Sequence, residues 1–257
     1  MTADTPDPLV VYTVIIGDGY RLPPVRPIQD VPHLCFTDQR LETNGWDIVP
    51  ISPVLPADPV RSSRDPKVRP HRFLPTYTRS LYIDPSVDLR APAQDLWAAL
   101  MPAPDHVFGC IRHSYRATLG DEFDAVAAAS LEHARVLREL RDMLDAHHPG
   151  ALSLRPSWGG ILARRHHDPL CVDAMELWYA HILRYARRDQ LTLPLILSRL
   201  PEARRNITAL DNHLSAFHAW PIEGYVRPER YRSGFRQNPY HRKFRKLLKR
   251  AFGLPIY

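Results

Sequence analysis

Short apolar runs typical of buried β-strands alternate with segments of helical character over the first two thirds of the chain. The runs are rich in β-branched and aromatic residues and cover 9–16, 33–36, 46–51, 80–83, 106–111 and 158–163. Helices are expected at 94–100, 122–147, 169–187 and 189–200, with 122–147 as one long helix because it contains no glycine or proline. This alternation predicts an α/β protein whose mostly parallel sheet is covered by helices.

The composition is that of a globular, loop-rich protein. Hydrophobic residues make up 44% of the chain, and its 26 prolines against 11 glycines gather in the connections. The three cysteines, an odd number, lie in apolar surroundings and are expected to be reduced core residues rather than a disulfide framework. We see no signal peptide and no apolar stretch of 18 residues, so the expected location is the cytoplasm.

A change of composition divides the chain into a predicted single domain, 9–224, and a basic C-terminal tail, 225–257. The tail carries ten lysines and arginines between 227 and 250 against the single acid Glu229, in a chain of net charge +6. Apolar residues at helical spacing predict an amphipathic helix from Tyr240 to Phe252, suited to an anionic membrane surface or to packing on the domain. Binding of nucleic acid through the tail is a third, less favoured alternative.

A carboxylate follows the apolar run 80–83 directly, in Asp84-Pro85-Ser86-Val87-Asp88. Proline ends strand pairing because it has no amide donor, so Asp84 is expected at the carboxyl end of a strand. Ligands of open α/β sheets collect at that edge. Asp84 and Asp88 offer the hard oxygen ligands that suit Mn²⁺ or Mg²⁺, although the same residues are also good turn formers.

A group of basic residues precedes that strand, between Arg61 and Arg72. Arg64 and Lys67 are three residues apart, and Lys67 and His71 four apart, so a short helix would place them on one face. Such a face would bind a phosphate, whereas the simpler alternative is an exposed basic turn. Other chemistries lack their motifs: there is no Gly-rich phosphate loop with lysine, no G-x-G-x-x-G, no G-x-S-x-G and no H-E-x-x-H. The adjacent pairs His147-His148 and His166-His167 are expected to be solvated.

Several of these segments together resemble a known family, the TOD/MUCI-type glycosyltransferase-like domains. The segments that carry the likeness, in chain order over roughly 9–200, are 12–17, 35–38, 67–71, 80–84, Arg112-His113 with Glu122, 175–178 and 188–191. The resemblance implies a GT-A-like αβα sandwich with a mostly parallel central sheet, here followed by the helical basic tail. It also implies a nucleotide-sugar donor, with Mn²⁺ or Mg²⁺ held at the donor diphosphate by a carboxylate motif.

The resemblance further implies roles for individual residues. Thr13 and Gly17 would border the nucleotide, Asp38 would accept a hydrogen bond from base or ribose, and Lys67, with Arg64 and His71, would approach a phosphate. Asp189 and Gln190 would face the sugar or the acceptor. Asp189 would be a general base, unless it only caps a helix, and Glu122 is a second candidate base unless it is a surface carboxylate at a helix start.

The carboxylate motif departs from the Asp-x-Asp that many GT-A enzymes carry, because Ser86 follows Asp84. The further metal ligand would then be Asp88 or a late histidine, His213 or His218, although each histidine could equally be an ordinary loop residue. The function expected is therefore sugar transfer to a glycan or lipid-linked acceptor, with peripheral membrane contact through the tail. The alternatives are a nucleotide-sugar-binding domain without catalysis and a nucleic-acid-binding protein. The sequence leaves open the donor sugar, the acceptor and the stereochemical course.

Overall fold

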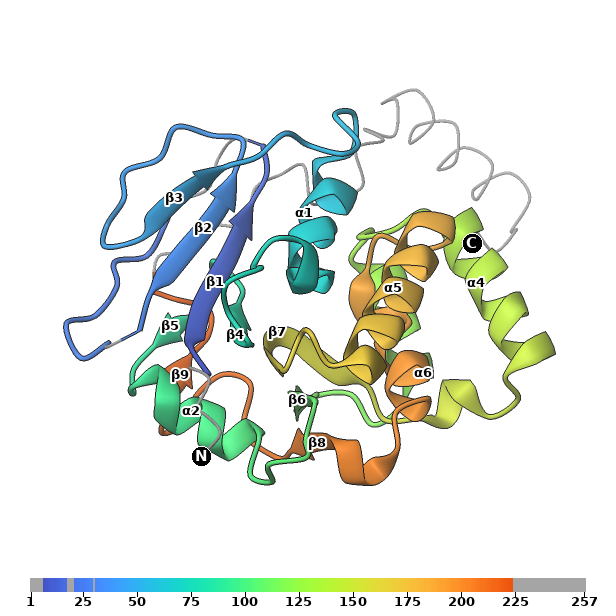
Figure 1. Cartoon of the computed structure of the whole chain (residues 1–257). Helices are drawn as coiled ribbons and strands as arrows, with labels where there is room; N and C mark the ends of the chain where they lie inside the picture. Colours follow the sequence, from blue (N-terminus) through green and yellow to red (C-terminus); the bar gives the residue numbers. More distant parts are fainter. Residues whose placement is uncertain (1–6, 18–20, 30, 224–257) are drawn as a thin grey trace.

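A seven-stranded sheet forms the centre of the molecule in the computed structural model, which describes residues 7–17, 21–29 and 31–223 (Figure 1). The strand order is β3-β2-β1-β4-β7-β6-β8. The strands are β1 (Leu9–Ile15), β2 (His33–Thr37), β3 (Asp47–Pro50), β4 (Arg79–Ile83), β6 (Phe108–Arg112), β7 (Ser157–Arg164) and β8 (Arg205–Thr208). A separate two-stranded sheet pairs β5 (Asp88–Leu89) with β9 (His218–Ala219).

The strand directions confirm the predicted α/β class with a mostly parallel sheet. β1 runs parallel to β2 and β4, and β2 runs parallel to β3. β7 is antiparallel to both of its neighbours, and β8 at the far edge is parallel to β6. The carboxyl ends of β1, β2 and β3 therefore lie at one edge, uppermost in Figure 1.

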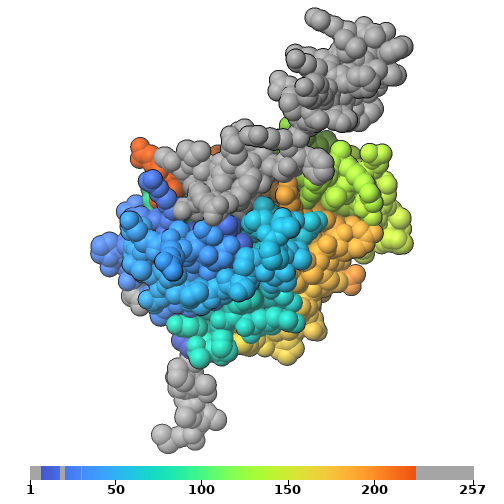
Figure 2. Space-filling model, turned by 90° about the horizontal axis from the view of Figure 1, so that it is seen from above, coloured from blue at the N-terminus to red at the C-terminus, as the bar shows by residue number. Residues whose placement is uncertain are grey.

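Helices cover both faces of this sheet. They are α1 (Pro59–Val68), α2 (Ala93–Leu100), α3 (Leu119–Ala128), α4 (Ala134–His147), α5 (Pro169–Arg184) and α6 (Leu193–Ser198). On β1, Val10, Tyr12 and Val14 face the core shared with α5 and α6, whereas Leu9 and Val11 face the core shared with α2. All of these side chains are buried, as continuous apolar strands covered on both faces require. Figure 2 looks down on the molecule from above and shows α1 (cyan) beside α5 (orange).

The predicted helix over 122–147 is wrong in one respect, since it is two helices with a break at 129–133. Ser130 takes a positive φ of 52°, and the buried Glu132 accepts a hydrogen bond from the amide of Arg187. The turn lets Leu137, Leu140 and Leu144 of α4 join a core that also contains α3. A tertiary contact to a distant loop thus accompanies a break that no local breaker residue predicts.

Smaller differences concern the second half of the described chain. The predicted helix 189–200 is a 3₁₀ turn, Asp189–Leu191, followed by α6, which has Pro194 in its first turn. β8 was not predicted, because its burial is only intermediate and its apolar content low. The basic tail, 225–257, and the helix predicted within it lie outside the described residues. No helix in the described ranges is both long and apolar enough to cross a membrane.

Candidate functional site

A pocket opens where β4 and β7 meet α1 and the 3₁₀ turn Asp189–Leu191. Its charged lining residues are Arg64 and Lys67 from α1, Asp84 after β4, and Arg188 and Asp189 before and in the turn. Three cations thus face two carboxylates among the described lining residues. Val14, Tyr82, Pro85, Ser86, Trp158, Gly159, Gly160, Gln190 and Trp220 complete the lining.

Asp84 stands at the carboxyl end of β4, as predicted. Its amide donates to the carbonyl of Gly160 on β7 (2.8 Å), which fixes the backbone at the pocket edge. Its carboxylate accepts a hydrogen bond from the Ser86 hydroxyl (3.1 Å), and that hydroxyl accepts one from the Trp220 indole (2.9 Å). Ser86 therefore does not add a second acid beside Asp84, but it orients the one that is there.

Lys67 and Asp189 form a buried ion pair at the base of the pocket, and the guanidinium of Arg64 lies 3.5 Å from the same carboxylate. Burial lowers the pKa of Lys67, and Asp189 opposes that effect. Burial would raise the pKa of Asp189, but Arg64, Lys67 and Arg188 together bring it well below its usual value. Asp189 is thus an ionised counter-ion for the cations, and a carboxylate of such low basicity is a poor general base.

Arg64 and Lys67 share one face of α1 because they lie three residues apart on a helix that begins at Pro59. Arg164 of β7 holds the end of this helix from inside the core. Its guanidinium donates to the carbonyl of Lys67 (2.8 Å) and to the hydroxyl of Tyr12 (2.6 Å), although its side chain is fully buried. A cation at the carbonyl end of a helix is favoured by the helix dipole. Arg164 therefore fixes the position of Lys67.

Two glycines of β7 leave room for the pocket. A Cβ atom on Gly159 would lie 3.4 Å from the Lys67 nitrogen and 3.6 Å from a carboxylate oxygen of Asp189. A Cβ atom on Gly160 would lie 2.3 Å from the ring of Trp158, which folds over it. The backbone of β7 thus forms one wall of the site, and any side chain at Gly160 would displace the tryptophan.

The structure also brings Gly17 and Asp38 together, two residues that the family resemblance assigns to the nucleotide. The amide of Gly17 donates to the carboxylate of Asp38 (2.7 Å), joining the carboxyl ends of β1 and β2. Gly17 has a positive φ of 75°, a conformation that glycine adopts without strain. Asp38 lines an open depression along β2 and β3, separate from the Asp84 pocket. The two sites share the edge of the sheet where parallel strands end.

Three further predicted site residues, besides Gly17 and Asp38 above and the metal ligands described below, lie outside the Asp84 pocket. His71 turns away from Lys67, since α1 ends at Val68, and it pairs with Glu176 of α5 at 2.9 Å. Thr13 is fully buried within β1. Glu122 is buried beside His113 and Arg116, at 3.8 and 3.4 Å, and burial raises its pKa. Glu122 is not among the residues that line the Asp84 pocket.

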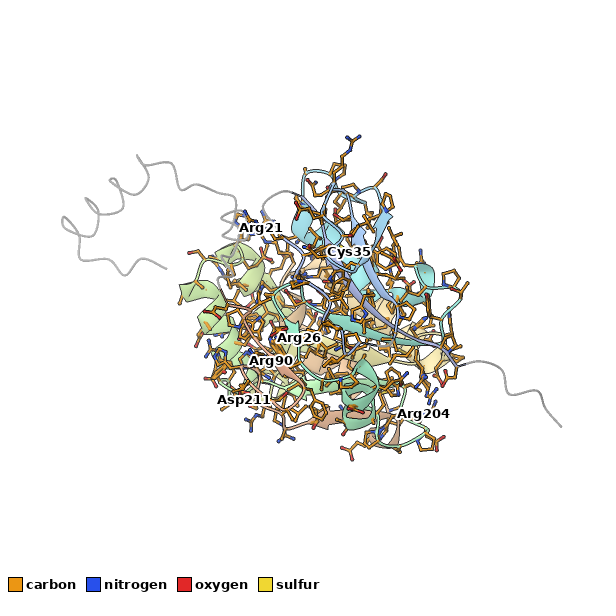
Figure 3. All side chains as sticks on the ribbon, turned by 90° about the vertical axis from the view of Figure 1, so that its left-hand side faces the viewer. Arg21, Arg26, Cys35, Arg90, Arg204 and Asp211 are labelled. Carbon is orange, nitrogen blue, oxygen red and sulfur yellow. The ribbon has the colours of Figure 1, made fainter. Side chains whose placement is uncertain are left out.

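The predicted metal ligands do not converge in the structure. Asp88 pairs with Arg26 (2.7 Å) and Arg90 (3.0 Å), two arginines labelled in Figure 3, and it lines a different, small pocket. His213 is exposed, with a ring nitrogen 2.8 Å from the carbonyl of Trp220, and the buried His218 pairs with Ser215. Within the described ranges no three His, Cys, Asp or Glu side chains form a group that could hold a metal ion.

Sequence reasoning missed the residues that form the walls of the pocket and support it from behind. Trp158, Trp220 and the two glycines of β7 were not assigned to the site, and Arg164 was not assigned at all. A Trp-Gly-Gly step within an apolar strand was a usable signal, since glycine in a strand often marks a close approach of the backbone to a ligand. No local pattern marks Trp220, because the fold brings it to the pocket from a segment far from β4 and β7 in the sequence.

Comparison with known proteins identifies the family of this chain. The family model described as TOD1/MUCI70, glycosyltransferase-like domain, matches residues 33–214. No curated protein matches the chain in sequence.

Two of the solved structures that match the chain are glycosyltransferases by title. The apo form of mouse xyloside xylosyltransferase 1 has a TM-score of 0.43 and 9% identity, covering 80% of this chain and 87% of that one. The apo bifunctional glycosyltransferase WbbM has a TM-score of 0.45 and 9% identity, covering 82% of this chain and 40% of that one.

Proposed function

Since the chain belongs to the TOD1/MUCI70 glycosyltransferase-like domain family, we propose that it transfers a sugar from a nucleotide-sugar donor whose diphosphate binds in the Asp84 pocket. The acceptor is a glycan or a lipid-linked sugar. The observation that carries this proposal is the convergence of Arg64, Lys67 and Arg188 with Asp84 at the carboxyl end of β4. A buried cationic pocket at that edge is suited to a phosphorylated ligand.

The cations of the pocket have a direct role in such a reaction. Negative charge grows on the leaving diphosphate as the bond to the sugar breaks, and fixed positive groups stabilise that charge most where water is excluded. Lys67 is fixed by Asp189 and by the support of Arg164 behind α1, so little reorganisation is needed during the reaction. We assign Asp189 to positioning these cations rather than to accepting a proton.

A divalent metal, Mn²⁺ or Mg²⁺, is part of the proposal with Asp84 as its one protein carboxylate. Mg²⁺ is commonly bound through one or two carboxylates together with substrate phosphates, so a single well-oriented carboxylate fits this mode. Such a metal would neutralise charge on the diphosphate. In this arrangement Asp88 is no ligand, because its carboxylate is engaged by Arg26 and Arg90.

The test uses Asp84→Asn, with Asp88→Asn as the matched control in the same segment. Binding of UDP, GDP, CDP and ADP sugars is measured by thermal shift with and without Mn²⁺, together with release of nucleoside diphosphate. A ligand at 100 times its Kd stabilises the native state by about 2.7 kcal/mol. We expect one donor class to stabilise the wild type, Mn²⁺ to enhance that effect, and Asp84→Asn alone to lose the enhancement and the turnover.

Three other results would contradict the proposed function in whole or in part. Full turnover in Asp84→Asn would refute the role of Asp84, and no shift with any donor would refute the donor pocket. Donor binding with no release or transfer under any condition would favour the second candidate, a binding domain without catalysis. That candidate has one observation in its favour, since Ser86 stands where many GT-A enzymes have a second acid.

A further inference from the structure

A chain of aromatic rings leads from the Asp84 pocket to the surface. Trp158 and Trp220 both line the pocket, with ring centres 5.3 Å apart. His213 stacks on Trp220 at 5.3 Å with an angle of 20° between the ring planes, and Tyr115 lies 4.8 Å from His213. We name these four residues the aromatic ladder. Its inner end belongs to the proposed donor site and its outer end, Tyr115, is 45% exposed.

The outer rungs are held by a rigid framework rather than by a free loop. Asn212 is fully buried, and its side-chain amide donates to the carbonyl of Arg112 (2.9 Å) and accepts from the amide of Ser114 (2.8 Å). Its own amide donates to the Ser114 hydroxyl (2.9 Å). The segment that carries His213 is thereby fastened to the loop that carries Tyr115. An exposed ring fixed in this way loses little entropy when a ligand binds to it.

The surface beside the ladder is polar as well as aromatic. Burial raises the pKa of the Tyr115 hydroxyl, and the nearby carboxylate of Asp211 raises it further. Arg112, three residues before Tyr115, is exposed. Figure 3 shows Asp211 at the edge of the described fold. Flat rings bordered by charged and hydroxyl groups match the faces and edges of a pyranose, which presents C–H groups to a ring and hydroxyls around its rim. A lipid tail would instead need a continuous apolar surface.

We propose that the aromatic ladder is the acceptor site and binds the saccharide part of the acceptor, with Tyr115 stacking on a sugar unit outside the pocket. This inference rests on the proposed function, because an acceptor must reach the donor sugar at the pocket mouth. Each ring-to-ring step along the ladder is similar in length to one pyranose unit of a glycan. Tyr115 therefore contacts a sugar other than the one that reacts.

The probes are cellobiose, xylobiose, maltose and lactose, and their binding to the full chain is measured by saturation-transfer difference NMR. Tyr115→Ala removes the outer ring, Tyr115→Phe keeps the ring and removes the hydroxyl, and Leu183→Ala is a control at an exposed residue of α5. We expect at least one disaccharide to bind the wild type. Its signal should fall at least threefold in Tyr115→Ala and be retained in Tyr115→Phe and Leu183→Ala.

A parallel titration with UDP, GDP, CDP and ADP separates this inference from the proposed function. Nucleoside diphosphate affinity should be the same in Tyr115→Ala as in the wild type, because Tyr115 does not line the pocket. Disaccharide binding that survives Tyr115→Ala, or that is absent from the wild type for all four probes, overturns the acceptor site. Disaccharide binding that depends on Tyr115, with no nucleotide bound by the wild type, supports the ladder and refutes the donor pocket.

Discussion

At the scale of single residues, Asp189 lies in the pocket as the ionised partner of Lys67, Arg64 and Arg188. Its position in the family motif predicted a base near the reacting sugar, and the structure does place it in the pocket. Its neighbours decide its chemistry, because three cations lower its pKa and Lys67 occupies its carboxylate. The sequence motif thus predicted that Asp189 lies at the site. Its protonation state depends on contacts with cations that only the folded structure brings together.

Asp189→Asn tests this role directly. Removing one partner of a buried ion pair leaves its partners uncompensated, so we expect the free energy of unfolding to fall by about 3 kcal/mol in urea denaturation. Nucleoside diphosphate affinity should be kept or increased, because the pocket loses a negative charge. A variant as stable as the wild type would contradict the counter-ion role.

At the scale of elements, the strand ends were predictable and the walls of the site were not. The apolar runs predicted the carboxyl ends of β1, β2 and β4, and Pro85 marked the end of β4, because an apolar run and a proline are local features of the sequence. The contribution of Trp220 and the break between α3 and α4 depend on contacts between segments far apart in the chain. Ser130 has a positive φ although it is not a glycine, so the local sequence does not predict that break.

Gly159→Ala tests whether the wall formed by β7 limits the pocket. The added methyl group would be in ordinary contact with Lys67 and Asp189, so the fold should tolerate it while the volume open to the diphosphate shrinks. We expect nucleotide affinity to fall about tenfold, or about 1.4 kcal/mol, with an unchanged melting temperature. Gly120→Ala in α3, where a Cβ atom meets only Thr118 and Leu152, is the control. Equal nucleotide affinity in both variants would remove Gly159 from the site.

At the scale of the whole molecule, the family match begins at residue 33 and omits β1, although β1 lies between β2 and β4. The resemblance inferred from the sequence includes β1, and the amide of Gly17, after β1, donates to the carboxylate of Asp38, after β2.

The fold also buries side chains to which the sequence analysis assigned no role. His166 was expected to be solvated, but it is fully buried and its ring lies 3.2 Å from the carbonyl of Leu74.

Buried histidines predict a dependence of stability on pH. Burial lowers the pKa of both His113 and His166 to about 4. Between the unfolded value near 6.5 and about pH 4, the unfolded chain binds protons that the folded protein does not, so stability falls as pH falls through this window. Each histidine adds a slope of at most about 1.4 kcal/mol per pH unit.

Urea denaturation at several pH values measures that slope. We expect His166→Gln, whose amide can still donate to the carbonyl of Leu74, to lose less stability than the wild type on acidification from pH 6.5 to 4. An identical slope in the two proteins would show that His166 is protonated in the folded state over this range. Denaturation at pH 8, where neither form is charged, gives the cost of the substitution itself.

The central claim, that the Asp84 pocket binds the donor diphosphate, is tested most directly by titration calorimetry of Lys67→Gln with UDP, GDP, CDP and ADP in the presence of Mn²⁺. Arg72→Gln is the matched control, since Arg72 follows in the same stretch of chain but pairs with Glu176 outside the pocket. We expect one nucleotide to bind the wild type and Arg72→Gln equally, and Lys67→Gln at least tenfold more weakly. No binding by the wild type, or equal binding by folded Lys67→Gln, would contradict the claim.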